Sequence, residues 1–208
     1  MSTKTTLGIF GLGTVGTGVV ALLRDNPQFD IRAISVRDRN KTRDFDFSQF
    51  EMNQDPFKLA EDPGIEILVE VAGGIDPAYE VVKRAISSGK HIVTANKALL
   101  AEHGGELFDR ARQLGRSIAF EASVCGGIPI IANISQCFSA NEITSIKGIL
   151  NGTSNFIVTQ MDEQRWNYAD ALVQAQKLGY AEADPTMDVD GSDAAQKLAI
   201  LAHLAFGA

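Results

Sequence analysis

The glycine motif GLGTVG at residues 11–16 constrains the fold more than any other feature of this chain. It follows the apolar segment LGIF, residues 7–10, which is typical of a buried strand, and it opens a stretch over 15–23 with apolar side chains at helical spacing. In a dinucleotide-binding turn, Gly11 permits the sharp turn, Gly13 lets the backbone approach a pyrophosphate, and Gly16 lets the helix pack on the strand. The N–H groups of the first helical turn, which contains Thr14 and Val15, would bind the phosphates. The alternative is a structural corner without a ligand.

Strands and helices alternate over residues 1–121, and this context favours the dinucleotide interpretation. Residues 29–36, 65–74 and 117–122 predict strands, and residues 91–116 predict a strand, a loop and a long helix. Asp76 is the expected cap of a helix over 76–90, with Pro77 as its first residue and Gly89 as its end. Residues 37–47 predict a polar loop. The fold class is α/β, with a doubly wound, mostly parallel, Rossmann-like sheet in a dinucleotide-binding domain.

A second domain is expected over residues 122–208, where the pattern changes. A glycine-rich loop enters an apolar segment at 121–134, and residues 142–150 alternate like a strand. Helices are predicted at about 153–164, 168–178 and 192–206, with an acidic loop, YAEADPTMDVDGSD, before the last. These patterns predict an α+β substrate and dimerisation domain.

Composition excludes several classes of function. A net charge of −7 and a pI near 5.0 argue against nucleic acid as the main partner. No apolar run has the length of a membrane span, and the N-terminus lacks the pattern of a secretory leader, so a cytoplasmic protein is expected. Cys125 and Cys137 are too few for a disulfide framework and are expected to be reduced thiols.

Four motifs carry a resemblance to a known family: ANKALLA at 95–101, EASVCGGIPII at 121–131, GILNGTSNFI at 148–157, and GYAEADPTMDVDGSDAAQKLAIL at 179–201. In this order behind a dinucleotide turn, they resemble homoserine dehydrogenase. The resemblance implies reversible, nicotinamide-dependent interconversion of aspartate 4-semialdehyde and homoserine, in the pathway to threonine, methionine and isoleucine. The sequence stops inside the resembled substrate domain, so that domain is expected to be truncated. The alternative function is a non-catalytic nucleotide-binding or subunit-assembly module.

Two lysines are candidates for the chemistry. Lys97 follows Asn96 directly after an expected strand, where α/β sheets bind ligands. The alternative is an ordinary surface lysine, but the helix dipole disfavours a cation at a helix start, and this favours a functional role. Asp193 and Lys197 are four residues apart on an expected helix, and an ordinary exposed pair at that spacing contributes only about 0.3–0.5 kcal/mol. The resemblance implies that Lys97 polarises the substrate carbonyl, that Lys197 is the acid-base group, and that Asp193 is a catalytic-site carboxylate.

Binding residues are expected in the second domain from the same resemblance. Glu182 and Asp188 would bind the substrate ammonium group, although a solvated acidic turn is the interpretation without the resemblance. Gly152 and Thr153 would line the wall that contacts cofactor and substrate, and Thr153 is the expected helix cap.

The resemblance also implies a site for a monovalent cation such as Na⁺. The Glu121 carboxylate would join main-chain oxygens of Val124, Gly126 and Ile128, and hard cations prefer such oxygen ligands. The alternative is a plain interdomain hinge.

The cofactor is expected to be NADP, with NAD as the alternative. Arg37 follows the second expected strand, where NAD-preferring folds place an acidic residue, and Arg37 and Lys41 would contact the 2′-phosphate. Asp38 is one residue further on, where it could reach a ribose hydroxyl. Gly73, Asn96 and Lys97 complete the expected cofactor contacts.

The final helix predicts self-association. Apolar surface exposed to water costs about 25 cal/mol per Å², so the apolar side chains of this helix predict a homodimer or larger oligomer formed through the second domain. These side chains are Leu198, Ile200, Leu201, Leu204 and Phe206.

Overall fold

The computed structural model describes residues 4–41 and 46–207, so part of the expected polar loop, residues 42–45, lies outside the described residues. The chain divides into two compact units, Met1–Pro129 and Ile130–Ala208. The division at 121/122 expected from the sequence stays a prediction. Among the described residues, no helix has the length and apolar character needed to cross a membrane.

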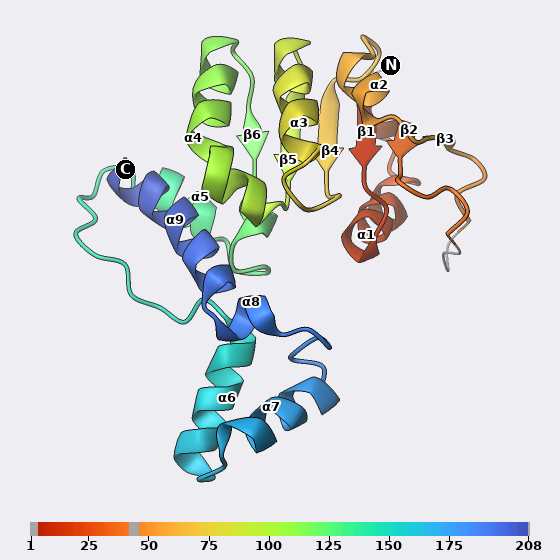
Figure 1. The fold of residues 1–208 in the computed structure, drawn as a ribbon. Coiled ribbons are helices and arrows are strands. Elements are labelled where there is room, and N and C mark those ends of the chain that lie inside the picture. The colour runs from red at the N-terminus through yellow and green to blue at the C-terminus, as the bar shows by residue number, and fades with distance from the viewer. Residues whose placement is uncertain (1–3, 42–45, 208) are drawn as a thin grey trace. The chain divides into compact units, whose positions relative to one another are not determined.

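The first unit is built on one six-stranded sheet in the order β3-β2-β1-β4-β5-β6, and every strand pair is parallel (Figure 1). Its strands are β1 (Thr5–Phe10), β2 (Phe29–Ser35), β3 (Glu51–Asn53), β4 (Ile67–Glu70), β5 (His91–Thr94) and β6 (Ile118–Ala119). The strand order reverses between β1 and β4, which are neighbours although they are not consecutive in the sequence. The doubly wound, Rossmann-like sheet predicted from the alternating elements is confirmed.

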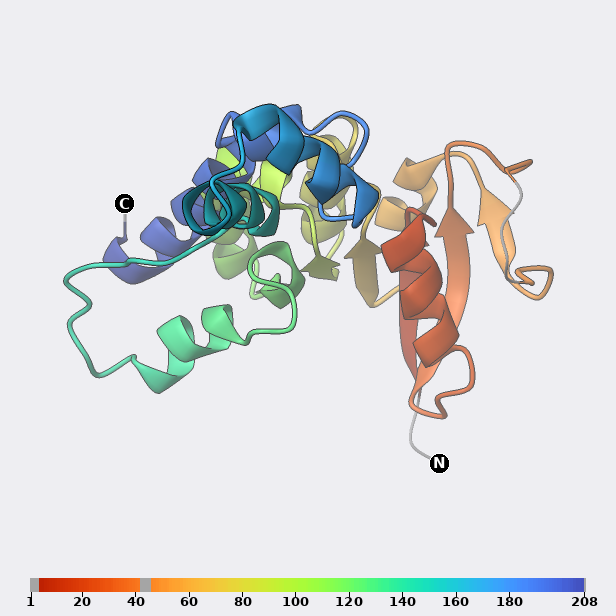
Figure 2. The same cartoon turned by 90° about the horizontal axis from the view of Figure 1, so that it is seen from below.

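Apolar side chains cover both faces of this sheet, because successive residues of a strand point to opposite sides. Ile9 and Val69 pack with Val20 of α1 (Thr14–Leu23), and Figure 2 shows α1 running along β1 and β2. Their neighbours Phe10 and Leu68 pack in a second cluster with α2 (Pro56–Glu61), α3 (Ala78–Ser87) and α4 (Lys97–Gln113). The two clusters therefore pack against both faces of the sheet at β1, β2 and β4.

Three local expectations for the first unit are corrected. Asp76 is not the cap of α3, because Pro77 occupies the N-cap position and no side chain caps the helix; Gly89, with φ +83°, follows the helix end as expected. The last strand is shorter than predicted, because a turn of 3₁₀ helix, η1 (Glu121–Ser123), follows β6. β3 and α2 were not predicted, although Asp55 and Pro56 form a recognisable helix start in which Asp55 accepts a hydrogen bond from the Phe57 N–H.

All the regular secondary structure among the described residues of the second unit is helical. It contains the single turn α5 (Ile130–Ala132), a π-helical turn η2 (Asn133–Cys137), α6 (Gly152–Glu163), α7 (Tyr168–Lys177), α8 (Thr186–Val189) and α9 (Ser192–Phe206). The three longer helices confirm the sequence prediction.

The strand expected over 142–150 is wrong. That segment is mostly exposed and has no regular structure, and no strand forms in the described residues 130–207 that could bond its N–H and C=O groups. Of the helices and strands expected in this α+β domain, only helices form in the described residues 130–207. The helix cap is also corrected: Asn151, not Thr153, caps α6 by accepting a hydrogen bond from the Ser154 N–H at 2.7 Å.

Candidate functional site

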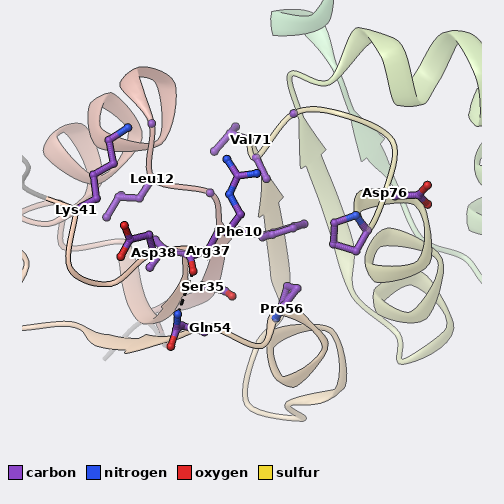
Figure 3. A pocket seen from close by; sticks show the side chains of 16 residues that line it. Phe10, Leu12, Ser35, Arg37, Asp38, Lys41, Gln54, Pro56, Val71 and Asp76 are labelled. Carbon is purple, nitrogen blue, oxygen red and sulfur yellow. Dashed lines mark hydrogen bonds between the residues drawn. The ribbon is translucent and has the colours of Figure 1, made fainter.

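A cavity of about 690 Å³ lies at the carboxyl ends of β1, β2 and β4 in the first unit (Figure 3). Its wall comes from the glycine turn, from the segment after β2, and from the loop after β4, which includes Gly73. This is the switch point of the strand order, where open α/β sheets bind ligands.

The glycine turn has the geometry that a dinucleotide requires. Gly11 has φ +103°, and a Cβ there would lie 2.5 Å from the Ala72 nitrogen; a Cβ at Gly16 would lie 2.2 Å from the Gly11 oxygen. At Gly13 a Cβ would meet nothing within 4 Å, and Gly13 lines the cavity. The first two glycines therefore permit close backbone packing, and Gly13 leaves space that a pyrophosphate could occupy. Thr14 and Val15 form the exposed first turn of α1, whose N–H groups suit an anion.

Residues of both charge signs line the cavity on the side of the segment that follows β2. Arg37, Asp38 and Lys41 all belong to its wall, and in Figure 3 the Arg37 side chain points toward Val71, whereas Asp38 and Lys41 lie on the side of Leu12. Gln54 donates a hydrogen bond to the Arg37 carbonyl at 3.0 Å, which holds the backbone at the start of this segment. Two cations and one carboxylate thus face the position expected for a ribose and its substituents.

Buried polar side chains connect the loop after β4, which lines the cavity, to the start of α4. Asn96 caps α4 by accepting a hydrogen bond from the Leu99 N–H, and it donates to the Gly74 carbonyl at 2.6 Å. Lys97 is the first residue of that helix and is partly buried. Glu70, which ends β4, is completely buried, and burial raises the pKa of its carboxyl group although its hydrogen bonds oppose the shift.

A second polar cluster lies within the second unit. Lys197 donates to Asp193 Oδ2 at 2.7 Å and to the Leu150 carbonyl at 2.8 Å. Asn151 donates from its amide nitrogen to Asp193 Oδ2 at 2.9 Å and to Asp188 Oδ1 at 2.7 Å. The side chains of Asp193 and Lys197 are only 10% and 20% exposed, so this is not the ordinary surface pair that four-residue spacing produces on a solvated helix.

The remaining predicted residues of the second unit lie around this cluster in different surroundings. Thr153 is buried, and its hydroxyl donates to the Tyr180 carbonyl at 2.6 Å. Gly152 is the exposed first residue of α6. Glu182 is exposed in the loop before α8, where its main-chain carbonyl accepts a hydrogen bond from Gln176. The hydrogen bonds therefore join Asp188, Asp193 and Lys197, whereas Glu182 stands apart from that set.

The expected cation loop is compact. Glu121 begins η1, Val124 is buried, and Ile128 donates its N–H to the Cys125 carbonyl at 2.9 Å. Cys125 has φ +51°, and Gly126 follows it in the exposed part of the loop. The four expected oxygen donors all belong to residues 121–128, and the hydrogen bond from Ile128 to Cys125 closes the C-terminal end of that segment.

Sequence reasoning missed the residues that organise both clusters. Glu70 and Thr94 end apolar strands, and a single polar residue closing such a run is the signal that could have identified them. Asn151 lies within the motif at 148–157 but was given no role of its own, yet its amide donates to two carboxylates.

The parallel sheet, the glycine turn and the cavity define an α/β protein of the dinucleotide-binding class. Comparison with family models agrees: the model described as "Homoserine dehydrogenase, NAD binding domain" matches residues 11–121, and that described as "Homoserine dehydrogenase" matches residues 129–208. The chain belongs to the homoserine dehydrogenase family, as the motif resemblance implied.

Relatives of known sequence and structure support this assignment. Homoserine dehydrogenase of Pseudomonas aeruginosa is 47% identical over 208 residues, which covers 97% of this chain and 48% of that protein. The crystal structure of a homoserine dehydrogenase from Thiobacillus denitrificans matches with a TM-score of 0.90 and 44% identity, covering 99% of this chain and 49% of that one. A hyperthermophilic archaeal homoserine dehydrogenase in complex with NADPH matches with a TM-score of 0.84 and 30% identity, covering 99% and 71%. The chain spans about half the length of the curated relatives it matches.

Proposed function

We propose that this chain contributes the dinucleotide-binding domain and part of the catalytic domain of an enzyme that interconverts L-aspartate 4-semialdehyde and L-homoserine. The observation that carries the proposal is the partly buried, hydrogen-bonded cluster of Lys197, Asp193, Asn151 and Asp188 in a chain that also has a dinucleotide cavity. An ion pair whose side chains are only 20% and 10% exposed is costly to desolvate, which supports a chemical role for this cluster.

The residues have separate roles in this proposal. A bound nicotinamide supplies or accepts the hydride, and the protein supplies orientation, charge and the proton. Lys197, oriented by Asp193, transfers the proton to or from the substrate oxygen, and Lys97 polarises the carbonyl. Glu182 and Asp188 bind the substrate ammonium group, and Gly152 and Thr153 form part of the wall.

The proposed cofactor is NADP in preference to NAD. Gly11, Gly13 and Gly16 with the first turn at Thr14 and Val15 would hold the pyrophosphate, and Gly73 and Asn96 would contribute further along the cofactor. Arg37 and Lys41 in the cavity wall support a site for the 2′-phosphate, since a guanidinium binds phosphate through two parallel N–H groups. The archaeal relative whose structure contains NADPH is consistent with this choice.

A monovalent cation such as Na⁺ is proposed at the loop of Glu121, with main-chain oxygens of Val124, Gly126 and Ile128. The support is the hydrogen bond that closes this loop between Ile128 and Cys125, because a preformed turn lowers the cost of gathering carbonyl oxygens around an ion.

We further propose a dinucleotide-binding domain of residues 1–121, a cytoplasmic location, and assembly as a homodimer or larger oligomer.

The proposal is tested by adding aspartate semialdehyde and NADPH to the chain and following the absorbance band of the reduced nicotinamide. Turnover that depends on both reactants supports the catalytic function. NADPH binding without turnover supports instead the nucleotide-binding module that is the alternative function.

Gly13→Ala places a methyl group in the cavity and is expected to weaken NADPH binding, whereas Gly18→Ala on the exposed part of α1 is the matched control.

A further inference from the structure

Glu70 occupies an unusual place for a charged residue, because it ends a strand at the centre of the sheet and is completely buried. Its two carboxylate oxygens together join two segments of the chain, and Oε1 also accepts a longer hydrogen bond from the Asn96 amide at 3.4 Å. Oε1 accepts the N–H groups of Ala72 at 3.0 Å and Gly73 at 3.3 Å, in the loop that lines the cavity. Oε2 accepts the Thr94 hydroxyl at 2.6 Å, at the end of the neighbouring strand β5.

The connection continues from Thr94 to the start of α4. Thr94 Oγ1 accepts the N–H of Asn96 at 3.0 Å, and Asn96 donates back to the Gly74 carbonyl at 2.6 Å. Asn96 also caps α4, whose first residue is Lys97. A closed set of hydrogen bonds therefore joins the cavity loop 72–74 to the turn that presents Lys97.

Stability alone gives no reason for a carboxylate at this position. A buried charged group is costly to desolvate, and a well-packed apolar residue of similar volume is often at least as stabilising. What Glu70 provides is geometric, because two oxygens with fixed directions hold two loops from separate strands in one arrangement.

We propose that Glu70 is a positioning residue that sets the loop 72–74 and the Asn96–Lys97 turn for the nicotinamide half of the dinucleotide. This inference rests on the proposed function. In a Rossmann sheet the dinucleotide crosses the switch point, with its adenosine half over β2 and its other half toward β4 and β5. Arg37 belongs to the adenosine side, so Glu70 should affect one half of the cofactor and leave the other unchanged.

The test compares two ligands by fluorescence or calorimetric titration of the full chain: NADPH, and adenosine 2′,5′-bisphosphate, which lacks the nicotinamide half. Glu70→Gln keeps the size of the side chain but replaces one acceptor by a donor, and Thr94→Val removes the hydroxyl link with little change in shape. We expect each variant to weaken NADPH binding about tenfold or more, the effect of losing one hydrogen bond to a charged group, and to change bisphosphate binding less than about twofold.

Lys90→Met is the matched control. Among the described residues of the first unit, Lys90 is the other fully buried charged residue, but it precedes β5 at the opposite end of the sheet, where Nζ donates to the Asp62 and Ile65 carbonyls. Its replacement should lower stability without the selective loss of NADPH affinity.

Four outcomes decide the question. Selective loss of NADPH affinity in both variants supports the inference, and if Glu70→Gln fails to fold, Thr94→Val decides. Unchanged NADPH affinity, or equal losses for the two ligands, overturns it while the proposed function stands. A wild-type chain that binds neither ligand overturns the proposed function and the inference with it.

Discussion

At the scale of single residues, the two fully buried charged side chains among the described residues of the first unit differ in what they hold. Lys90 donates to two carbonyls before β4 and joins backbone segments at the end of the sheet away from the cavity. Glu70 accepts from the loop and the strand that border the cavity. Backbone and neutral side-chain groups supply the hydrogen bonds of both, and the negative charge of Asp62 also favours the charged form of Lys90.

The pH dependence of stability should report the burial of Glu70. Burial raises its pKa above the ordinary 4.5, and the groups that oppose the shift, Thr94, Asn96 and two backbone N–H groups, are neutral. Above pH 4.5 the folded state therefore binds more protons at Glu70 than the unfolded state, and the free energy of unfolding falls as pH rises through the raised pKa. The difference in this free energy, wild type minus Glu70→Gln, should decrease from pH 4.5 upward and then become constant. Urea unfolding at a series of pH values measures it, and a pH-independent difference would contradict the prediction.

Arg37 should determine the cofactor preference. Arg37→Ala is expected to lower NADPH affinity while leaving NADH affinity nearly unchanged, because only NADPH carries the 2′-phosphate that a guanidinium can bind. Wild-type protein should bind NADPH more tightly than NADH. Titration of both cofactors against both proteins provides the measurement, with Arg39→Ala as a control from the same segment. Equal wild-type affinities, or an unchanged NADPH affinity in Arg37→Ala, would disprove the assignment.

The two lysines should act in the transition state more than in binding. In a family-length form with measured turnover, Lys197→Ala should lower kcat about 100-fold or more, the usual effect of removing a general acid. Lys97→Ala should be comparably damaging because it removes the charge that polarises the carbonyl. Lys177→Ala, at the exposed end of α7, is the control and should keep full activity. A loss of less than about tenfold in either variant would remove its catalytic role.

At the scale of elements, the sequence predicted what local patterns determine. The strands β1, β2, β4 and β5 contain apolar runs or alternating apolar residues, and α6, α7 and α9 have apolar residues at helical spacing, so each was identified. β3 has three residues, too few to show a period. Residues 142–150 alternate correctly for a strand, but a strand also needs a neighbour, and that requirement lies outside the segment itself.

The candidate site shows the same division between local and non-local information. The turn at Gly11–Gly16 could be identified because its chemistry is contained in consecutive residues. Asn151, Asp188 and Asp193 are brought together by folding over some 40 positions, and their joint role was invisible in the separate segments. The predicted spacing of Asp193 and Lys197 was correct, but only the structure shows that the pair is buried.

Asn151 should contribute more to stability than an ordinary helix cap. Asn151→Ala removes the cap of α6 and two hydrogen bonds to carboxylates, so we expect a loss of about 2–4 kcal/mol. Asn167→Ala removes a comparable but exposed cap on α7 and should cost about 1 kcal/mol. Asn151→Ser, which retains capping ability, should fall between the two. Urea unfolding of the three variants makes the comparison, and equal losses for Asn151→Ala and Asn167→Ala would show that the carboxylate bonds contribute nothing.

At the scale of the whole molecule, the two units contain different parts of the proposed chemistry. The first contains the dinucleotide cavity and Lys97, and the second contains the cluster of Asp188, Asp193 and Lys197. Hydride transfer needs cofactor and substrate in contact, so the proposed function requires the two units to act on one bound pair. Binding of the cofactor alone requires only the first unit, and the two activities can therefore be separated by experiment.

The second unit is expected to associate with another copy of the chain. Two of the α9 residues expected to be exposed are buried, because Ile200 and Leu201 are only 4% and 2% exposed. Other apolar side chains of this unit remain exposed, including Leu198 and Phe206 on α9 and Val158 on α6. Exposed apolar groups of this kind favour association, because each buried square ångström contributes about 25 cal/mol.

The measurement is light scattering on the purified chain over a range of concentrations, combined with NADPH binding and turnover on the same sample. We expect a homodimer or larger oligomer that binds cofactor better than it turns over substrate. Val158→Glu and Phe206→Glu place charges on the exposed apolar surface and should shift the oligomer toward monomer without loss of NADPH binding, since the proposed cofactor cavity is formed by the first unit alone. Leu22→Glu, on an exposed apolar residue of α1, is the matched control and should leave the mass unchanged. A monodisperse monomer with full activity would show that the apolar surface needs no partner and that these 208 residues suffice for catalysis.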